Sequence, residues 1–215
     1  WCSTDTFNIR GLRAFASSCE KYGREDVAKE IRAEIDDYLS VMYEIWNGYV
    51  KECADGDLYV RYSPSLPDEV VMANFAFSPH PSYFLDCLDL PEEQVERILE
   101  THKKKKYYNG DGLLDRMPDC DNSSGIASGT LDENGKCLIW YVCNQEYYWF
   151  KYFIRHGMME RCRELIRGAY KYAMTDEYYM FERYHQRNPW FAPWSPNASA
   201  SGRFIIMLLD FYGKI

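Results

Sequence analysis

Apolar residues recur every three or four positions along most of the chain, and this spacing predicts amphipathic helices. The first helix, predicted over 8–23, has its apolar stripe at Ile9, Leu12, Phe15, Ala16 and Cys19. The second, over 24–50, follows at once, with its stripe at Val27, Ile31, Ile35, Tyr38, Leu39, Met42 and Ile45. Gly23 stands between the two, where helices commonly end on a glycine. A helical hairpin with a very short connection is therefore predicted.

The same spacing predicts five more helices, over 80–90, 91–106, 137–157, 158–174 and 200–213. Gly157 again separates two of them by a short turn. The pairs are joined by long segments. One, 54–78, is rich in β-forming residues and is expected to hold one or two short strands. Another, 109–136, is rich in Gly, Asp, Asn and Ser.

This alternation of short turns and long segments predicts a single all-α domain over 1–215. Short turns are expected at one end of the helix assembly and long loops at the other. Long loops gathered on one face of a rigid scaffold form a binding face. The chain is also unusually aromatic, at 17% Phe, Trp and Tyr, and such rings fill large cores or line sugar-binding clefts.

Charge and hydropathy exclude two classes of partner. The net charge of −8 argues against nucleic acid, because binding a polyanion needs clustered positive charge. The one basic run, at 103–106, is read as the cationic last turn of a helix. No apolar stretch approaches the ~20 residues of a membrane span, so no membrane partner is expected.

Cysteine usage favours a reducing compartment, and hence slightly favours the cytoplasm. The eight cysteines, at positions 2, 19, 53, 87, 120, 137, 143 and 162, are scattered without a paired motif. Neither Cys nor His has the spacing of a metal site, so no metal and no cofactor is predicted. The chain opens on Trp1 without an initiator Met or signal peptide, which suggests a processed or excised piece of a longer protein.

Three carboxylates are the candidates for chemistry. Glu182 lies in an irregular segment among the rings of Tyr178, Tyr179, Phe181 and Tyr184. Glu146 lies on a helix rich in rings, where a carboxylate is costly unless it faces a cleft or a partner. Asp5 precedes the first predicted helix. Each also has a structural interpretation. Glu182 could be a partner for Arg183 or for a helix N-terminus, Glu146 could belong to a buried polar network, and Asp5 could be a helix cap or a partner for the helix dipole.

Several tryptophans stand at loop–helix junctions, where sugar rings could stack on them. These are Trp1, Trp190 and Trp194. In contrast, Trp140, Tyr147, Trp149 and Phe150 have helical spacing and are predicted to lie in the core. Asn197 suits the cap of the last helix.

Three stretches resemble the six-hairpin glycosidase superfamily, whose members are (α/α) toroids. They are "WCSTDTFNIRGLRAFASSCEKYG" at the start, "NGDGLLDRMP" in the middle and "FERYHQRNPWFAPWSPNASASGR" near the end. In glucoamylase-like members, the first stretch begins an inner helix at a Trp near the general acid, and the last carries the general base. A full toroid has about twelve helices, and this chain has seven predicted, so the resemblance implies roughly the C-terminal half.

The resemblance implies a glycoside hydrolase that uses a carboxylate acid/base pair. It assigns Glu182 as the base and Asp5 or Glu146 as the acid. Cys2 occupies the position where glucoamylase-like members have the acid. Carbohydrate would be bound by Trp1, Arg10, Tyr184, Trp190, Trp194 and Asn197.

Two alternatives remain open. One is a polysaccharide lyase, in which His185 and Tyr184 could act as the acid/base pair. The other is a non-catalytic helical module that binds a sugar or a protein. Half a toroid would expose an apolar flank, to be covered by a second copy or by the missing N-terminal half.

Overall fold

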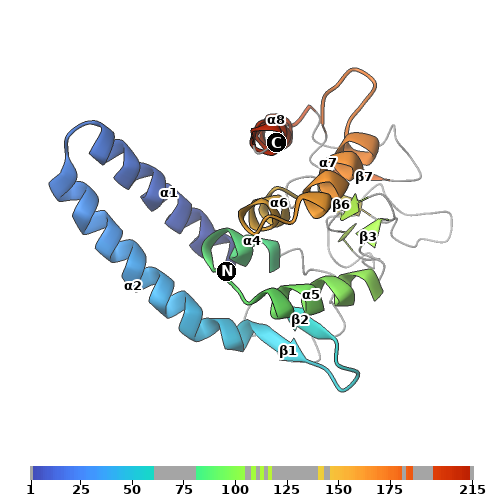
Figure 1. The fold of residues 1–215 in the computed structure, drawn as a ribbon, viewed down its shortest axis with the longest axis horizontal. Coiled ribbons are helices and arrows are strands. Elements are labelled where there is room, and N and C mark those ends of the chain that lie inside the picture. Colours follow the sequence, from blue (N-terminus) through green and yellow to red (C-terminus); the bar gives the residue numbers. More distant parts are fainter. Residues whose placement is uncertain are drawn as a thin grey trace, which may run out of the picture.

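The computed structural model describes residues 2–60, 81–104, 108–109, 112–113, 116–117, 140–142, 146–180, 183–185 and 196–213. This part of the chain is mostly helical, which confirms the predicted all-α character (Figure 1). The helices are α1 (Cys2–Lys21), α2 (Glu25–Tyr49), α4 (Pro81–Cys87), α5 (Glu92–Lys104), α6 (Glu146–Arg155), α7 (Met159–Ala173) and α8 (Ala198–Tyr212).

Helices α1 and α2 form the predicted hairpin, which extends as an arm from the rest of the fold (Figure 1). The buried residues of α2 include Ala28, Ile35, Met42 and Tyr49, which recur every seven residues. This repeat keeps the buried residues on one side of α2, which packs against α1 and, at its end, against Phe84 of α4. The turn contains Gly23 at φ +73°, and Gly157 has φ +71° between α6 and α7. Both glycines adopt the left-handed conformation that suits a helix end.

Short strands connect the helices in antiparallel pairs. They are β1 (Val50–Glu52), β2 (Leu58–Val60), β3 (Tyr108–Asn109), β4 (Gly112–Leu113), β5 (Arg116–Met117), β6 (Trp140–Val142) and β7 (Arg183–His185). Strand β1 pairs with β2, β3 pairs with β4, and the order β5–β6–β7 forms a three-stranded sheet.

The strand β6 corrects the helix predicted over 137–157, because in the structure that helix begins only at Glu146. The residues of β6 are aromatic or β-branched, which suits a strand, although their apolar character fits a helical stripe equally well. By contrast, β2 falls where a short strand was predicted.

Helices α1, α4, α6 and α8 form a row in which each contacts the next. Each follows a long connection or begins the chain, whereas the links from α1 to α2, α4 to α5 and α6 to α7 are short. Helices α6 and α8 run parallel, because Arg203 lies over Tyr147 at the start of α6 and Asp210 pairs with Lys151 farther along both helices. Short turns and long connections therefore alternate as predicted.

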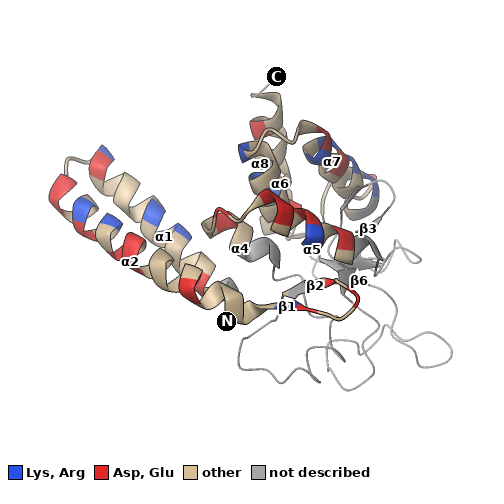
Figure 2. Ribbon diagram, turned by 60° about the horizontal axis from the view of Figure 1, so that its bottom comes forward, with Lys and Arg blue, Asp and Glu red and all other residues tan. Residues whose placement is uncertain are grey.

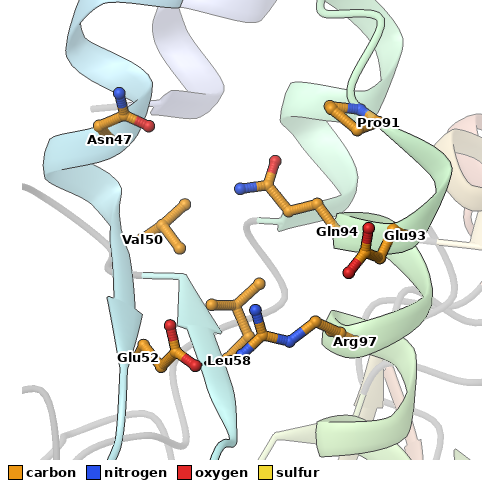
Figure 3. Close-up of a pocket in the computed structure, with 8 residues that line it drawn as sticks. All are labelled: Asn47, Val50, Glu52, Leu58, Pro91, Glu93, Gln94 and Arg97. Atoms are coloured by element: carbon orange, nitrogen blue, oxygen red, sulfur yellow. Dashed lines mark hydrogen bonds and ion pairs between the residues drawn. The ribbon is translucent and has the colours of Figure 1, made fainter.

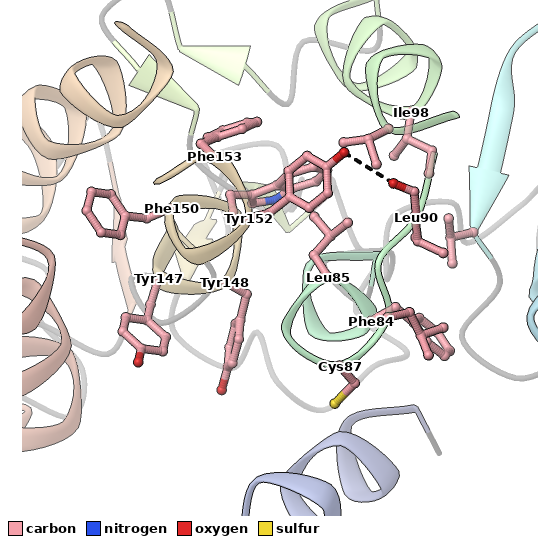
Figure 4. Close-up of a cluster of buried hydrophobic side chains, with 14 of the residues drawn as sticks. Phe84, Leu85, Cys87, Leu90, Ile98, Tyr147, Tyr148, Phe150, Tyr152 and Phe153 are labelled. Atoms are coloured by element: carbon pink, nitrogen blue, oxygen red, sulfur yellow. Dashed lines mark hydrogen bonds between the residues drawn. The ribbon is translucent and has the colours of Figure 1, made fainter. Parts of the chain in front are cut away.

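The main core lies where α4, α5 and α6 meet the base of the α1–α2 arm (Figure 4). Tyr147, Trp149 and Phe150 are buried there, which confirms their predicted place in the core, while the side chain of Trp140 lies outside the described residues. A smaller cluster between α7 and α8 consists of Ala169, Ala173, Met180, Ala200 and Phe204.

Three predicted positions differ in the structure. Phe15 and Ile45 were placed on buried stripes, but their side chains are 53% and 38% exposed. Both lie at the margins of their stripes, where spacing alone cannot tell a packed residue from a solvent-facing one. Asp5 was expected before the first helix, but α1 begins at Cys2, so Asp5 lies in its first turn, the position of a partner for the helix dipole rather than of the N-cap residue.

Asn197 caps α8, as its sequence suggested. Its side-chain oxygen accepts a hydrogen bond of 2.8 Å from the backbone N–H of Ala200. Substituting Asn197 by Ala is expected to lower the free energy of unfolding by about 1 kcal/mol, because one N–H of the first turn loses its partner. Chemical denaturation measures this. Asn197→Asp, which keeps an acceptor, should restore most of the stability, and equal losses in both variants would contradict the capping role.

Candidate functional site

Side chains from four helices meet at the start of α6. We call Arg10, Asp86, Tyr147, Tyr148 and Arg203 the arginine–tyrosine cluster. Arg10 comes from α1, Asp86 from α4, the two tyrosines from α6 and Arg203 from α8. Tyr147 and Tyr148 leave α6 in the same direction (Figure 4) and are 7% and 0% exposed. The cluster therefore joins the whole row of helices at one point.

Both arginines lie over the same two rings. The guanidinium carbon of Arg10 is 5.4 Å from the ring centre of Tyr147 and 5.6 Å from that of Tyr148. The corresponding distances for Arg203 are 5.9 and 5.4 Å. Such cation–π contacts stabilise by roughly 0.5–2 kcal/mol each. They also fix the direction of two long, flexible side chains.

Arg10 is further held by Asp86 and Tyr148. Its Nε lies 3.0 Å from the Asp86 carboxylate, and its Nη1 donates to the Tyr148 hydroxyl at 3.3 Å. The end of α4 receives two more arginines. Arg13 donates to the carbonyl of Asp86 at 3.3 Å, and Arg155 donates to that of Leu85 at 2.9 Å. These bonds satisfy carbonyl groups that the short helix leaves without a partner.

A cavity of about 540 Å³ adjoins the cluster. Asp86 belongs to both. The remaining lining comes from α6, α8 and the residue after α8: Lys151, Ile154, Arg155, Leu209, Asp210 and Gly213. Lys151 and Asp210 form an ion pair of 2.9 Å on this wall. The cavity is large enough for a small ligand, since such sites measure ~300–1,000 Å³.

Glu146 is the first residue of α6 and is 1% exposed. It directly precedes the two tyrosines of the cluster, so the backbone of this predicted site residue lies beside the meeting point of the helices. A carboxylate in the first turn is stabilised by the positive end of the helix dipole. That Glu146 faces a cleft or a polar partner stays a prediction, made because a buried carboxylate is costly otherwise.

The three-stranded sheet brings a second candidate segment toward α6. Val142 of β6 pairs with Arg183 of β7. Val142 precedes Glu146 by four residues, and Arg183 follows Glu182 directly. Glu182 itself lies outside the described residues. The pairing nevertheless joins the chain entering α6 to the chain that has just passed Glu182.

Asp5 faces a different neighbour. Its carboxylate accepts a hydrogen bond of 2.7 Å from the hydroxyl of Tyr38, on α2. Burial, with a further contribution from this bond to Asp5, raises the pKa of Tyr38. Asp5 therefore lies on the side of α1 that packs against α2, whereas Arg10 lies on the side that meets α6. The structure does not group Asp5 with the arginine–tyrosine cluster.

The predicted substrate-binding residues are distributed unevenly. Arg10 belongs to the cluster, Asn197 caps α8, and Tyr184 lies in β7 opposite Tyr141. Trp1, Trp190 and Trp194 lie outside the described residues. Sequence reasoning missed Asp86 and Arg203 and assigned Tyr147 only to the core. Arg203, a charged residue directly before the apolar stretch 204–209, was the available signal.

Cys87 and Cys162 are expected to resist alkylation in the native protein. Burial raises the pKa of each thiol to about 12 from 9.0, so the reactive thiolate is scarce at pH 8. Iodoacetamide followed by peptide mapping should modify them only after denaturation, while the half-buried thiol of Cys53 should react earlier. Because the pKa of each thiol is higher in the folded than in the unfolded chain, the free energy of unfolding should fall as the pH rises from 9 to 12. Rapid native labelling of Cys87 would contradict this.

None of the helices described is long and apolar enough to cross a membrane. Comparisons with protein-family models, curated proteins and solved structures find no match for this chain.

Proposed function

We propose that this chain is part of an (α/α) toroid that hydrolyses a glycosidic bond, with its site at the start of α6. The observation that carries the proposal is the row α1–α4–α6–α8, in which alternate helices of the chain lie side by side. In this arrangement the row is an arc of inner helices, and α2, α5 and α7 are outer helices. The parallel course of α6 and α8 supports it.

The two edges of the row support an incomplete ring. At one edge, α1 exposes Phe7 and Phe15. At the other, α8 exposes Ile205, Ile206, Leu209 and Tyr212. Exposed apolar faces of this kind occur where a protein packs against something else. Further helices would continue the arc at both edges.

Glu146 and Glu182 are the proposed pair. Glycoside hydrolysis needs one carboxyl to protonate the leaving oxygen and another to activate water or attack the sugar. Glu146 is assigned as the acid, because it lies at the convergence of α1, α6 and α8, whereas Asp5 is bound to Tyr38 on another side. Glu182 is assigned as the base. The pairing of Val142 with Arg183 connects their segments.

The test is hydrolysis of a panel of oligosaccharides, with reducing ends measured as products. A hydrolase gives products that do not absorb in the near ultraviolet, whereas an absorbing unsaturated product would indicate a lyase. If neither activity were found over the panel, the remaining interpretation would be a non-catalytic binding module.

A further inference from the structure

A second hollow in the molecule lies far along the chain from the proposed catalytic residues, between the end of α2, the β1–β2 hairpin and α5 (Figure 3). We call it the α2–α5 groove. Its volume is about 390 Å³, within the ~300–1,000 Å³ range of small-molecule sites. We propose that the α2–α5 groove binds one unit of a neutral oligosaccharide, as an additional sugar site. The choice of ligand class rests on the proposed function.

Two donors of the groove are held in place by other side chains. The carbonyl oxygen of Gln94 accepts a hydrogen bond of 2.9 Å from the buried indole N–H of Trp46, so its amide N–H groups are directed to the other side, into the groove (Figure 3). Arg97 is held by Glu52 at 2.6 Å and by the carbonyl of Gly56 at 3.2 Å. Side chains fixed in this way lose little conformational entropy when a ligand binds.

Acceptors and an apolar base complete the groove. Asn47 on α2 and Glu93 on α5 line it from opposite walls, adding an amide that donates and accepts and a carboxylate that accepts (Figure 3). Val50, Leu58 and Pro91 supply apolar surface between them. A sugar ring has the complementary form, because hydroxyl groups at its edge both donate and accept while its C–H face is apolar.

The charges select a neutral ligand over an acidic one. Arg97 and Glu52 form an ion pair, which leaves the carboxylate of Glu93 as the net charge of the lining. The start of α5 adds to it, since Glu92 is also acidic there, whereas Glu96 is paired with Arg161 (Figure 2). A uronic acid would be repelled there, because like charges in a partly desolvated site oppose binding.

Titration of the full chain with neutral hexasaccharides (malto-, cello-, xylo- and manno-) tests the proposal by NMR. The indole N–H signal of Trp46 reports on the groove through its bond to Gln94, and its assignment follows from its loss in Trp46→Phe. At least one hexasaccharide should shift this signal saturably, and a hexauronate should not. No shift with any of the four would overturn the inference.

A matched pair of variants separates binding from helix stability. Glu93 and Glu92 both lie in the first turn of α5, but only Glu93 lines the groove. Glu93→Ala should weaken binding about tenfold, while Glu92→Ala should leave it unchanged. Equal weakening by both would overturn the inference. Hydrolysis without a shift of the Trp46 signal would refute sugar binding in the α2–α5 groove and leave the proposed function intact. A shift of that signal without hydrolysis would support binding in the groove and contradict the proposed function.

Discussion

Replacing Glu146 by Gln is expected to lower glycoside hydrolysis by ~10²–10⁴-fold, the usual contribution of a general acid or base. The amide keeps the size of the side chain but cannot donate a proton to the leaving oxygen. Because Gln keeps the volume of this buried side chain, its effect on stability should be small beside the loss of activity. Initial rates of product formation, measured beside thermal unfolding, separate the two effects.

The matched control is Glu30→Gln, which makes the same chemical change at an exposed position of α2. It should retain full activity. Activity of Glu146→Gln equal to that of the control would remove Glu146 from the mechanism. If Glu182→Gln alone abolished hydrolysis, Glu182 would remain as the base and the acid would have to be another carboxyl.

The largest expected effect on stability is that of Phe84→Ala. Phe84 is fully buried in α4, and its ring meets Trp46 and Tyr49 edge-on, with ring centres 4.7 Å apart in both pairs. Removing it should cost ~3–5 kcal/mol, because the transfer energy of the ring is lost and a cavity remains. For a chain of this size, the melting temperature should fall by roughly 6–20 °C.

Phe15→Ala provides the control, since it deletes the same group where it is 53% exposed. Its effect should stay within about 0.5 kcal/mol, as for most surface substitutions. Differential scanning calorimetry of the two variants compares them directly. A fall in melting temperature of similar size in both would show that α4 does not connect the arm to the core as tightly as its packing indicates.

The pattern of apolar residues was sufficient to predict the seven helices that the described residues contain and the turns at Gly23 and Gly157. Both depend on local physics: the 3.6-residue repeat, and the tolerance of glycine for positive φ. The same reasoning failed at β6, because a strand of aromatic and β-branched residues becomes visible only when β5 and β7 pair with it.

The site depended more on tertiary structure. Sequence alone selected Glu146 and Arg10 but also Asp5, and it had no means of showing that Asp5 turns toward Tyr38 while Arg10 turns toward Tyr148. Five positions along one helix separate these two residues, so a rotation of about 140° decides which neighbour each meets. The sequence by itself therefore determined the helices and their short turns, whose causes lie within a few residues. Only the packing of α1, α4, α6 and α8 decided which side chains meet in the arginine–tyrosine cluster, because those contacts join residues far apart in the chain.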